Sequence, residues 1–178
     1  MKLLRKMVLI VLLLPIVLLL VSFFLPSKYR VERTEVIMAP AEAIYPWLAQ
    51  LRKWPEWTVW NTNYDSTITH AFSGSPEGAG AEMSWTSKSG KFSLKLSAAD
   101  VKTGVNYDLN YEDGTFLCHG AVTMAAVEGG QRVTFSNEGK LGKHPVRRYF
   151  GLLIDKMLGG EVQKNLMGLK QKVEPKAN

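Results

Sequence analysis

Few residues in this chain have the types and spacing needed for acid–base, nucleophilic or metal chemistry. It has three histidines, His70, His119 and His144, and one cysteine, Cys118. No histidine stands at metal-ligand spacing from another histidine or a carboxylate, so the sequence predicts no metal site. Cys118 and His119 would make a nucleophile and its base, but neighbours in a strand point to opposite faces of a sheet. We therefore expect no catalytic residue and no cofactor at these positions.

Four charged residues occupy strand-like segments: Glu82, Asp108, Arg132 and Glu138. They alternate with apolar neighbours, which predicts that they point to water. One turned inward would need a partner, and its pKa would shift through burial. Such a residue would be the best acid–base candidate.

Four tryptophans lie close together in the chain, at Trp47, Trp54, Trp57 and Trp60. An indole ring offers a large apolar face with a single donor, which suits the entrance of a site for an amphipathic ligand. Ordinary packing between short helices is the alternative interpretation. Trp57 and Trp60 are the two that we expect in a cavity.

The net charge of +6 is concentrated at the two ends of the chain. A nucleic-acid-binding domain usually carries a basic stripe interleaved with aromatic or groove-entering residues, and none is present, so no nucleic-acid partner is expected. The densest basic group is Lys140, Lys143, Arg147 and Arg148. It is typical of a solvated helix start, and contact with anionic head groups is the alternative.

The segment from Met7 to Leu25 contains no charged residue. As a helix it would be about 28 Å long, close to the thickness of the hydrocarbon core of a bilayer. A cleaved signal peptide is the rival interpretation, but the bulky residues before Pro26 fit a cleavage site poorly. The sequence therefore predicts a single-pass membrane anchor at residues 1–26, spanning with residues 7–25, and a separate domain at 27–178.

The basic residues on either side of this span bear on its orientation. Lys2, Arg5 and Lys6 precede it, which favours an N-terminus in the cytoplasm and a domain on the non-cytoplasmic side. Basic residues just past the span weaken that bias, so a domain facing the cytoplasm stays the alternative.

Periodicity behind the anchor predicts one α+β domain. A strand at 29–38 is followed by a helix from about residue 40 and a second short helix at 52–61. Alternating segments with turns between them then predict about six antiparallel strands, at 67–72, 81–86, 92–96, 105–111, 116–127 and 132–137. An apolar stripe from Phe150 to Val173 steps by three and four and predicts a long final helix.

The sequence resembles the START-like, polyketide cyclase/dehydrase and lipid-transport (SRPBCC) superfamily over residues 30–173. The likeness is carried by APAEAIY at 39–45, WPEW at 54–57, GAGA at 78–81, RVTF at 132–135 and YFG at 149–151. The resemblance implies a helix-grip fold, in which a curved antiparallel sheet wraps a long C-terminal helix. It also implies a ligand cavity between them.

The lining of that cavity is predicted from the alternation of the strands and from the helix stripe. The candidate ligand-binding residues are Trp57, Trp60, Met83, Trp85, Phe92, Leu94, Tyr107, Leu109, Tyr111, Phe116, Val133, Phe135, Leu153, Ile154, Met157 and Leu158. Apolar lining with few polar groups is typical of a small-molecule site. We expect a membrane-anchored binding module for a hydrophobic or amphipathic, lipid-like molecule. A cyclase/dehydrase-type enzyme in the same cavity, or a protein-contact domain without ligand, are the alternatives.

Overall fold

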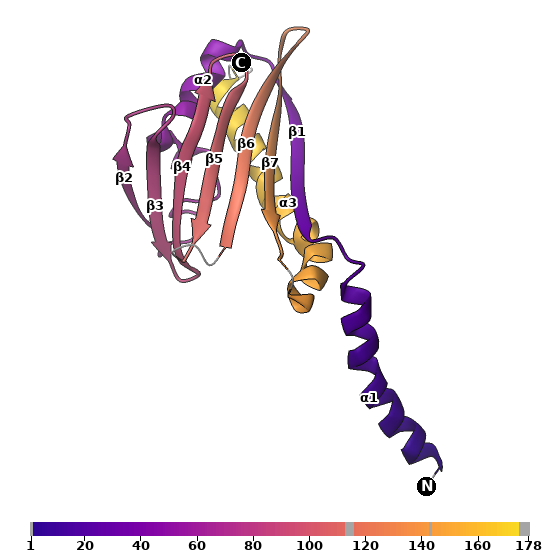
Figure 1. The fold of residues 1–178 in the computed structure, drawn as a ribbon. Helices are drawn as coiled ribbons and strands as arrows, with labels where there is room; N and C mark the ends of the chain where they lie inside the picture. The colour runs from indigo at the N-terminus through magenta and orange to yellow at the C-terminus, as the bar shows by residue number, and fades with distance from the viewer. Residues whose placement is uncertain (1, 113–115, 143, 175–178) are drawn as a thin grey trace.

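The structure, a computed structural model, describes residues 2–112, 116–142 and 144–174, and the side chains of these residues other than 2–5, 8–10 and 116. A long antiparallel sheet covers one side of helix α3, and helix α1 projects away from one end of the domain (Figure 1). This arrangement is the predicted helix-grip architecture of the α+β class.

The sheet of the described residues has seven strands in the order β1-β7-β6-β5-β4-β3-β2, with every neighbouring pair antiparallel. Consecutive strands from β2 to β7 pair with each other, whereas β1 pairs with β7, the last strand in the sequence. The predicted strands are confirmed, with the bounds β1 Lys28–Ile37, β2 Thr69–Gly74, β3 Ala81–Ser87, β4 Gly90–Asp100, β5 Gly104–Tyr111, β6 Phe116–Val127 and β7 Gly130–Lys140.

The helices are α1 (Lys2–Ser22), α2 (Ala41–Ala49), the 3₁₀ helix η1 (Leu51–Glu56) and α3 (Pro145–Val173). The predicted helix at 52–61 is therefore corrected to the shorter η1. Two indole nitrogens join η1 and the residue after it to α2: Trp54 Nε1 donates to the carbonyl of Leu48 at 2.9 Å, and Trp57 Nε1 donates to that of Trp47 at 3.1 Å. Each bond satisfies an indole N–H that packing would otherwise bury without an acceptor.

Helix α3 packs on the sheet along only part of its length. Val162, Leu166 and Leu169 are buried in the core. Leu153 is 51% exposed and Met157 is 61% exposed. The prediction that these two residues face the sheet was wrong, because they lie on the outward side of α3, whereas Ile154 packs against the core and Leu158 lines the cavity. The first turn of α3 also extends past the lower end of the strands (Figure 1).

An ion pair and a glycine join the middle of α3 to β1. The guanidinium of Arg33 donates to the carboxylate of Asp155 at 2.8 Å and 3.1 Å. A Cβ added at Gly159 would lie 1.9 Å from Nη2 of Arg33. The glycine therefore leaves the space through which the arginine crosses the helix.

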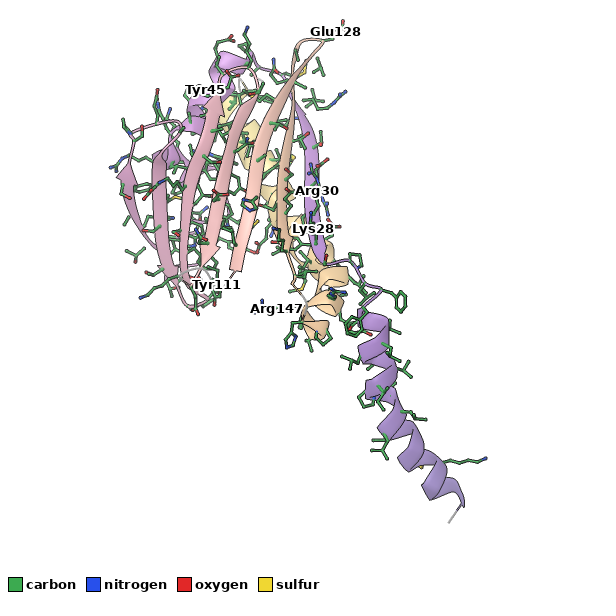
Figure 2. All side chains as sticks on the ribbon, in the orientation of Figure 1. Lys28, Arg30, Tyr45, Tyr111, Glu128 and Arg147 are labelled. Carbon is green, nitrogen blue, oxygen red and sulfur yellow. The ribbon has the colours of Figure 1, made fainter. Side chains whose placement is uncertain are left out.

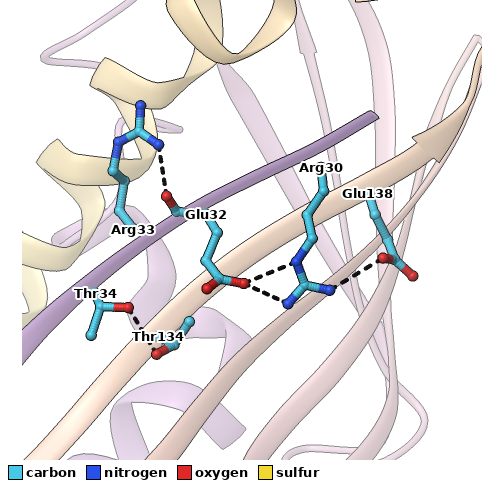
Figure 3. Close-up of polar contacts among 6 residues, drawn as sticks. All are labelled: Arg30, Glu32, Arg33, Thr34, Thr134 and Glu138. Carbon is cyan, nitrogen blue, oxygen red and sulfur yellow. Dashed lines mark hydrogen bonds and ion pairs between the residues drawn. The ribbon is translucent and has the colours of Figure 1, made fainter. Parts of the chain in front are cut away.

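Polar side chains cover the outer face of the sheet. Arg30 lies between Glu32 and Glu138, and Thr34 meets Thr134 at 3.0 Å (Figure 3). The prediction that the four charged strand residues point to water is confirmed: Arg132 and Glu138 are exposed, Glu82 pairs with Lys95, and Asp108 pairs with His119. Exposed pairs of this kind contribute little to stability because water screens them.

No helix among the residues with described side chains combines the length and the apolarity needed to cross a membrane. The span predicted at residues 7–25 includes residues 8–10, whose side chains lie outside that description. The anchor stays a prediction.

Candidate ligand-binding cavity

A cavity of about 410 Å³ lies between α3 and the inner face of the sheet. The strands contribute through residues of β1, β3, β4, β5, β6 and β7, the helix contributes through residues 158–165, and the segment 59–68 closes one side. The described lining residues are Tyr29, Val59, Trp60, Tyr64, Asp65, Ile68, Trp85, Ser87, Lys88, Ser89, Phe92, Leu109, Tyr111, Cys118, Asn137, Leu158, Glu161, Val162 and Asn165. The volume falls in the range of small-molecule sites.

One wall of the cavity is a row of aromatic rings. Trp60 stacks on Trp85 with ring centroids 5.2 Å apart, and Trp85 stacks on Phe92 at 5.1 Å. Phe92 in turn meets Tyr111 at 4.9 Å. Alternation along β3, β4 and β5 places these rings on one face, and the antiparallel registers pair Trp85 with Phe92 and Phe92 with Tyr111. Each ring is held by its neighbour, so the wall is preformed.

Two buried carboxamides supply the polar groups of the interior. Asn165 of α3 is 2% exposed, and its Oδ1 accepts the backbone N–H of Val59 at 2.7 Å. Asn137 of β7 is 8% exposed, and its Oδ1 accepts the hydroxyl of Tyr107 at 2.6 Å. Both residues line the cavity, one from the helix and one from the sheet.

Three ionisable groups surround Asn137, at what we call the buried end of the cavity, and they are held in their uncharged forms. Burial raises the pKa of the Cys118 thiol, and burial followed by the influence of Cys118 raises the pKa of Tyr29. Tyr107 is fully enclosed, and burial also raises its pKa well above the usual value. These three groups are protonated at neutral pH, so they offer hydrogen bonds rather than charge.

The charged lining residues Asp65, Lys88 and Glu161 are all at least partly exposed to solvent. Asp65 bonds the hydroxyl and the backbone N–H of Thr67, and these bonds lower the pKa of its carboxyl group. Glu161 accepts the hydroxyl of Tyr64 at 3.0 Å, and Lys88 is exposed on the β3–β4 turn. The side chain of Tyr111 lies at the same end of the domain as Lys28 and Arg147 (Figure 2).

Six of the predicted cavity residues line the cavity: Trp60, Trp85, Phe92, Leu109, Tyr111 and Leu158. Seven others pack in the core or against it instead, at Trp57, Met83, Leu94, Tyr107, Val133, Phe135 and Ile154. Leu153 and Met157 are exposed, and the side chain of Phe116 lies outside the described residues. The interior is therefore divided into a packed half and a hollow half.

Sequence reasoning missed the polar members of the lining, above all Asn137 and Asn165. The signal was present in both cases. Asn137 has the same strand parity as Val133 and Phe135, and Asn165 lies three residues after Val162 on the buried stripe of α3. A polar residue at an inward position of an apolar pattern is informative because burial requires it to find partners.

Comparisons with known proteins agree with this geometry. A protein-family model described as polyketide cyclase/dehydrase and lipid transport matches residues 28–174. No match to a curated protein sequence is found.

Solved structures share the fold at low sequence identity. Protein MLL2253 from Mesorhizobium loti has a TM-score of 0.59 at 15% identity, and the match covers 84% of this chain and 99% of that one. The Aha1 dimer from Colwellia psychrerythraea has a TM-score of 0.58 at 16% identity, covering 84% and 98%. Ara h 8.0201 has a TM-score of 0.56 at 13% identity, covering 81% and 99%. With strand order, final helix and family match in agreement, this chain is a member of the polyketide cyclase/dehydrase and lipid transport (SRPBCC) family.

Proposed function

We propose that this protein binds a hydrophobic or amphipathic small molecule in the cavity between α3 and the sheet. The observation that carries the proposal is the cavity of about 410 Å³, which is walled by the aromatic row and lined by two buried carboxamides. An apolar enclosure with a few placed polar groups is the usual form of such a site. The family, whose name includes lipid transport, supports the same assignment.

The chemistry of the buried groups favours binding over acid–base catalysis. Catalysis of the cyclase/dehydrase type requires a group that gives or takes a proton near neutral pH. Tyr29, Tyr107 and Cys118 all have raised pKa values and hold their protons there. His119 and Asp108 form their pair on the outer face, away from the cavity. We therefore assign Tyr29 and Cys118, which line the cavity, to ligand recognition.

We further propose that the domain works beside a bilayer, anchored by residues 1–26 with the domain on the non-cytoplasmic side. Exposed apolar residues on the first turns of α3 support a position at the membrane: Val146, Phe150, Leu152, Leu153 and Met157. They lie next to α1, whose Leu18 carbonyl accepts the hydroxyl of Tyr149 at 2.6 Å. Contact of such an apolar surface with lipid is more favourable in free energy than its contact with water.

Native mass spectrometry of the full chain, released from detergent micelles, tests the binding function. A reproducible mass adduct, identified by lipid extraction of the same sample, is the expected result. Leu109→Trp should remove the adduct, because Leu109 lines the cavity and the larger ring would fill it. Leu117→Trp is the matched control, since Leu117 is exposed on the neighbouring strand β6. Adducts of equal abundance in both variants would place the bound molecule outside the cavity and refute the proposal.

A further inference from the structure

In both cavity carboxamides the oxygen accepts a hydrogen bond, and the nitrogen has no hydrogen-bond partner among the described residues. Asn165 Oδ1 accepts a backbone N–H, which can only donate, so the orientation of this amide is fixed. Asn137 Oδ1 faces two donors, the Tyr107 hydroxyl at 2.6 Å and the Cys118 thiol at 3.5 Å. The oxygens thus have protein partners and the NH₂ groups remain to be satisfied.

Neither Nδ2 atom has a protein partner among the described residues. No side-chain nitrogen or oxygen in that part of the chain is both sealed from solvent and without a hydrogen bond. Both nitrogens therefore reach open space, and the space that both residues line is the cavity. A buried amide donor that faces a cavity is satisfied by an acceptor of whatever occupies it.

Electrostatics restrict the kind of acceptor. The charged residues of the lining, Asp65, Lys88 and Glu161, include two anions and one cation, and the cation is exposed on the β3–β4 turn. No lysine, arginine or histidine is among the described residues at the buried end. A carboxylate drawn to that end would lose its hydration without gaining a counter-ion, which is costly. Moving an uncharged oxygen to the same place costs far less desolvation free energy.

We infer that the ligand is an uncharged, largely apolar molecule that carries a carbonyl oxygen, as in a ketone, ester or amide. Asn165 and Asn137 donate to that oxygen at the buried end, and the apolar part lies along the aromatic row of Trp60, Trp85 and Phe92. This inference rests on the proposed function and adds to it the class of ligand and its direction in the cavity.

Three fluorescent probes with the same ring test the inference on the full chain. They are 6-(dimethylamino)naphthalene carrying at its 2-position a propionyl group, a carboxylate or a propyl group. The ketone should bind about tenfold more tightly than the propyl probe, as expected for a hydrogen bond or two in a buried site. The carboxylate should bind more weakly than the ketone by at least about tenfold.

Asn165→Asp removes the donor while leaving an oxygen for the N–H of Val59. This variant should lose the advantage of the ketone but keep its affinity for the propyl probe, which also reports that the cavity is intact. Asn106→Asp is the matched control, because Asn106 is exposed on β5 outside the cavity. It should bind all three probes like the unaltered protein.

The carbonyl stretching frequency of the bound ketone gives a second measurement that needs no variant. Infrared difference spectra with ¹³C-labelled ketone should show a frequency below that of the ketone in an alkane. A frequency equal to the alkane value, or a carboxylate that binds as tightly as the ketone, would overturn the inference and leave the binding function standing. Failure of all three probes to bind would overturn the inference together with the proposed function.

Discussion

Two glycines of α3 should respond in opposite ways to the same substitution. A Cβ added at Gly168 would lie 2.2 Å from the backbone oxygen of Trp57, whereas a Cβ at Gly160 meets nothing within 4 Å. Gly160 is exposed and Gly168 is half-buried on the same helix. Gly160→Ala and Gly168→Ala therefore make one chemical change in two different surroundings.

The magnitudes follow from helix propensity and overpacking. Alanine in a helix interior is more favourable than glycine by about 1 kcal/mol, so Gly160→Ala should raise the free energy of unfolding by about that amount. At Gly168 the same gain is opposed by a clash with backbone, which must move by about 1 Å to reach ordinary contact distance. Overpacking of this kind costs about 1–3 kcal/mol. Since the propensity term is common to both variants, the difference between them measures the clash alone.

Urea denaturation of the full chain in mild detergent, followed by tryptophan fluorescence, measures both values. We expect Gly168→Ala to be less stable than Gly160→Ala by about 1–3 kcal/mol. In thermal unfolding, each kcal/mol corresponds to about 2–4 °C for a chain of this size. Equal stabilities for the two variants would refute the close packing of α3 on the segment after η1.

Three further predictions concern the core and the buried thiol. Stability should fall from about pH 8 to about pH 10, because the folded chain keeps the Cys118 proton that the unfolded chain releases above the ordinary pKa of 9.0, and Cys118→Ala should flatten this fall in urea titrations. Leu166→Ala should cost about 2–5 kcal/mol while Leu153→Ala stays within about 0.5 kcal/mol, and equal losses would contradict the exposure of the first turns of α3. Gly120→Ala should cost about 1–3 kcal/mol, because its Cβ would lie 2.0 Å from the Tyr107 ring, and an unchanged urea midpoint would argue against that contact.

The strands could be predicted from the sequence because each repeats a simple local pattern. Alternation in β7 places Val133 and Phe135 inward, and both are fully buried. The same pattern cannot say how far along the sheet a residue lies. Val133 and Phe135 are in the packed half of the interior and Asn137 is in the hollow half, although all three share one parity.

The helix shows the same limit. Its apolar stripe continues from Phe150 to Val173, and local periodicity gives no sign that the sheet covers only its later turns. Phe150 is exposed and Leu166 is buried, yet both belong to the stripe. Coverage depends on where β1 and β7 end relative to α3, which is a tertiary property that no window of the sequence contains.

The pairing of β1 with β7 has a consequence for how the protein is made. The registered partners Lys28–Lys140 and Ile37–Gln131 are separated by roughly one hundred residues, and every other strand pair is joined by a short connection. During synthesis at about 5–20 residues per second, β1 emerges several seconds before its partner exists. Strands β2 to β6 can pair as they appear, whereas the first strand keeps an unpaired edge until the last is complete. Closing so long a loop has an entropic cost, so we expect the final step of folding to be the pairing of β1, the first strand made, with β7, the last.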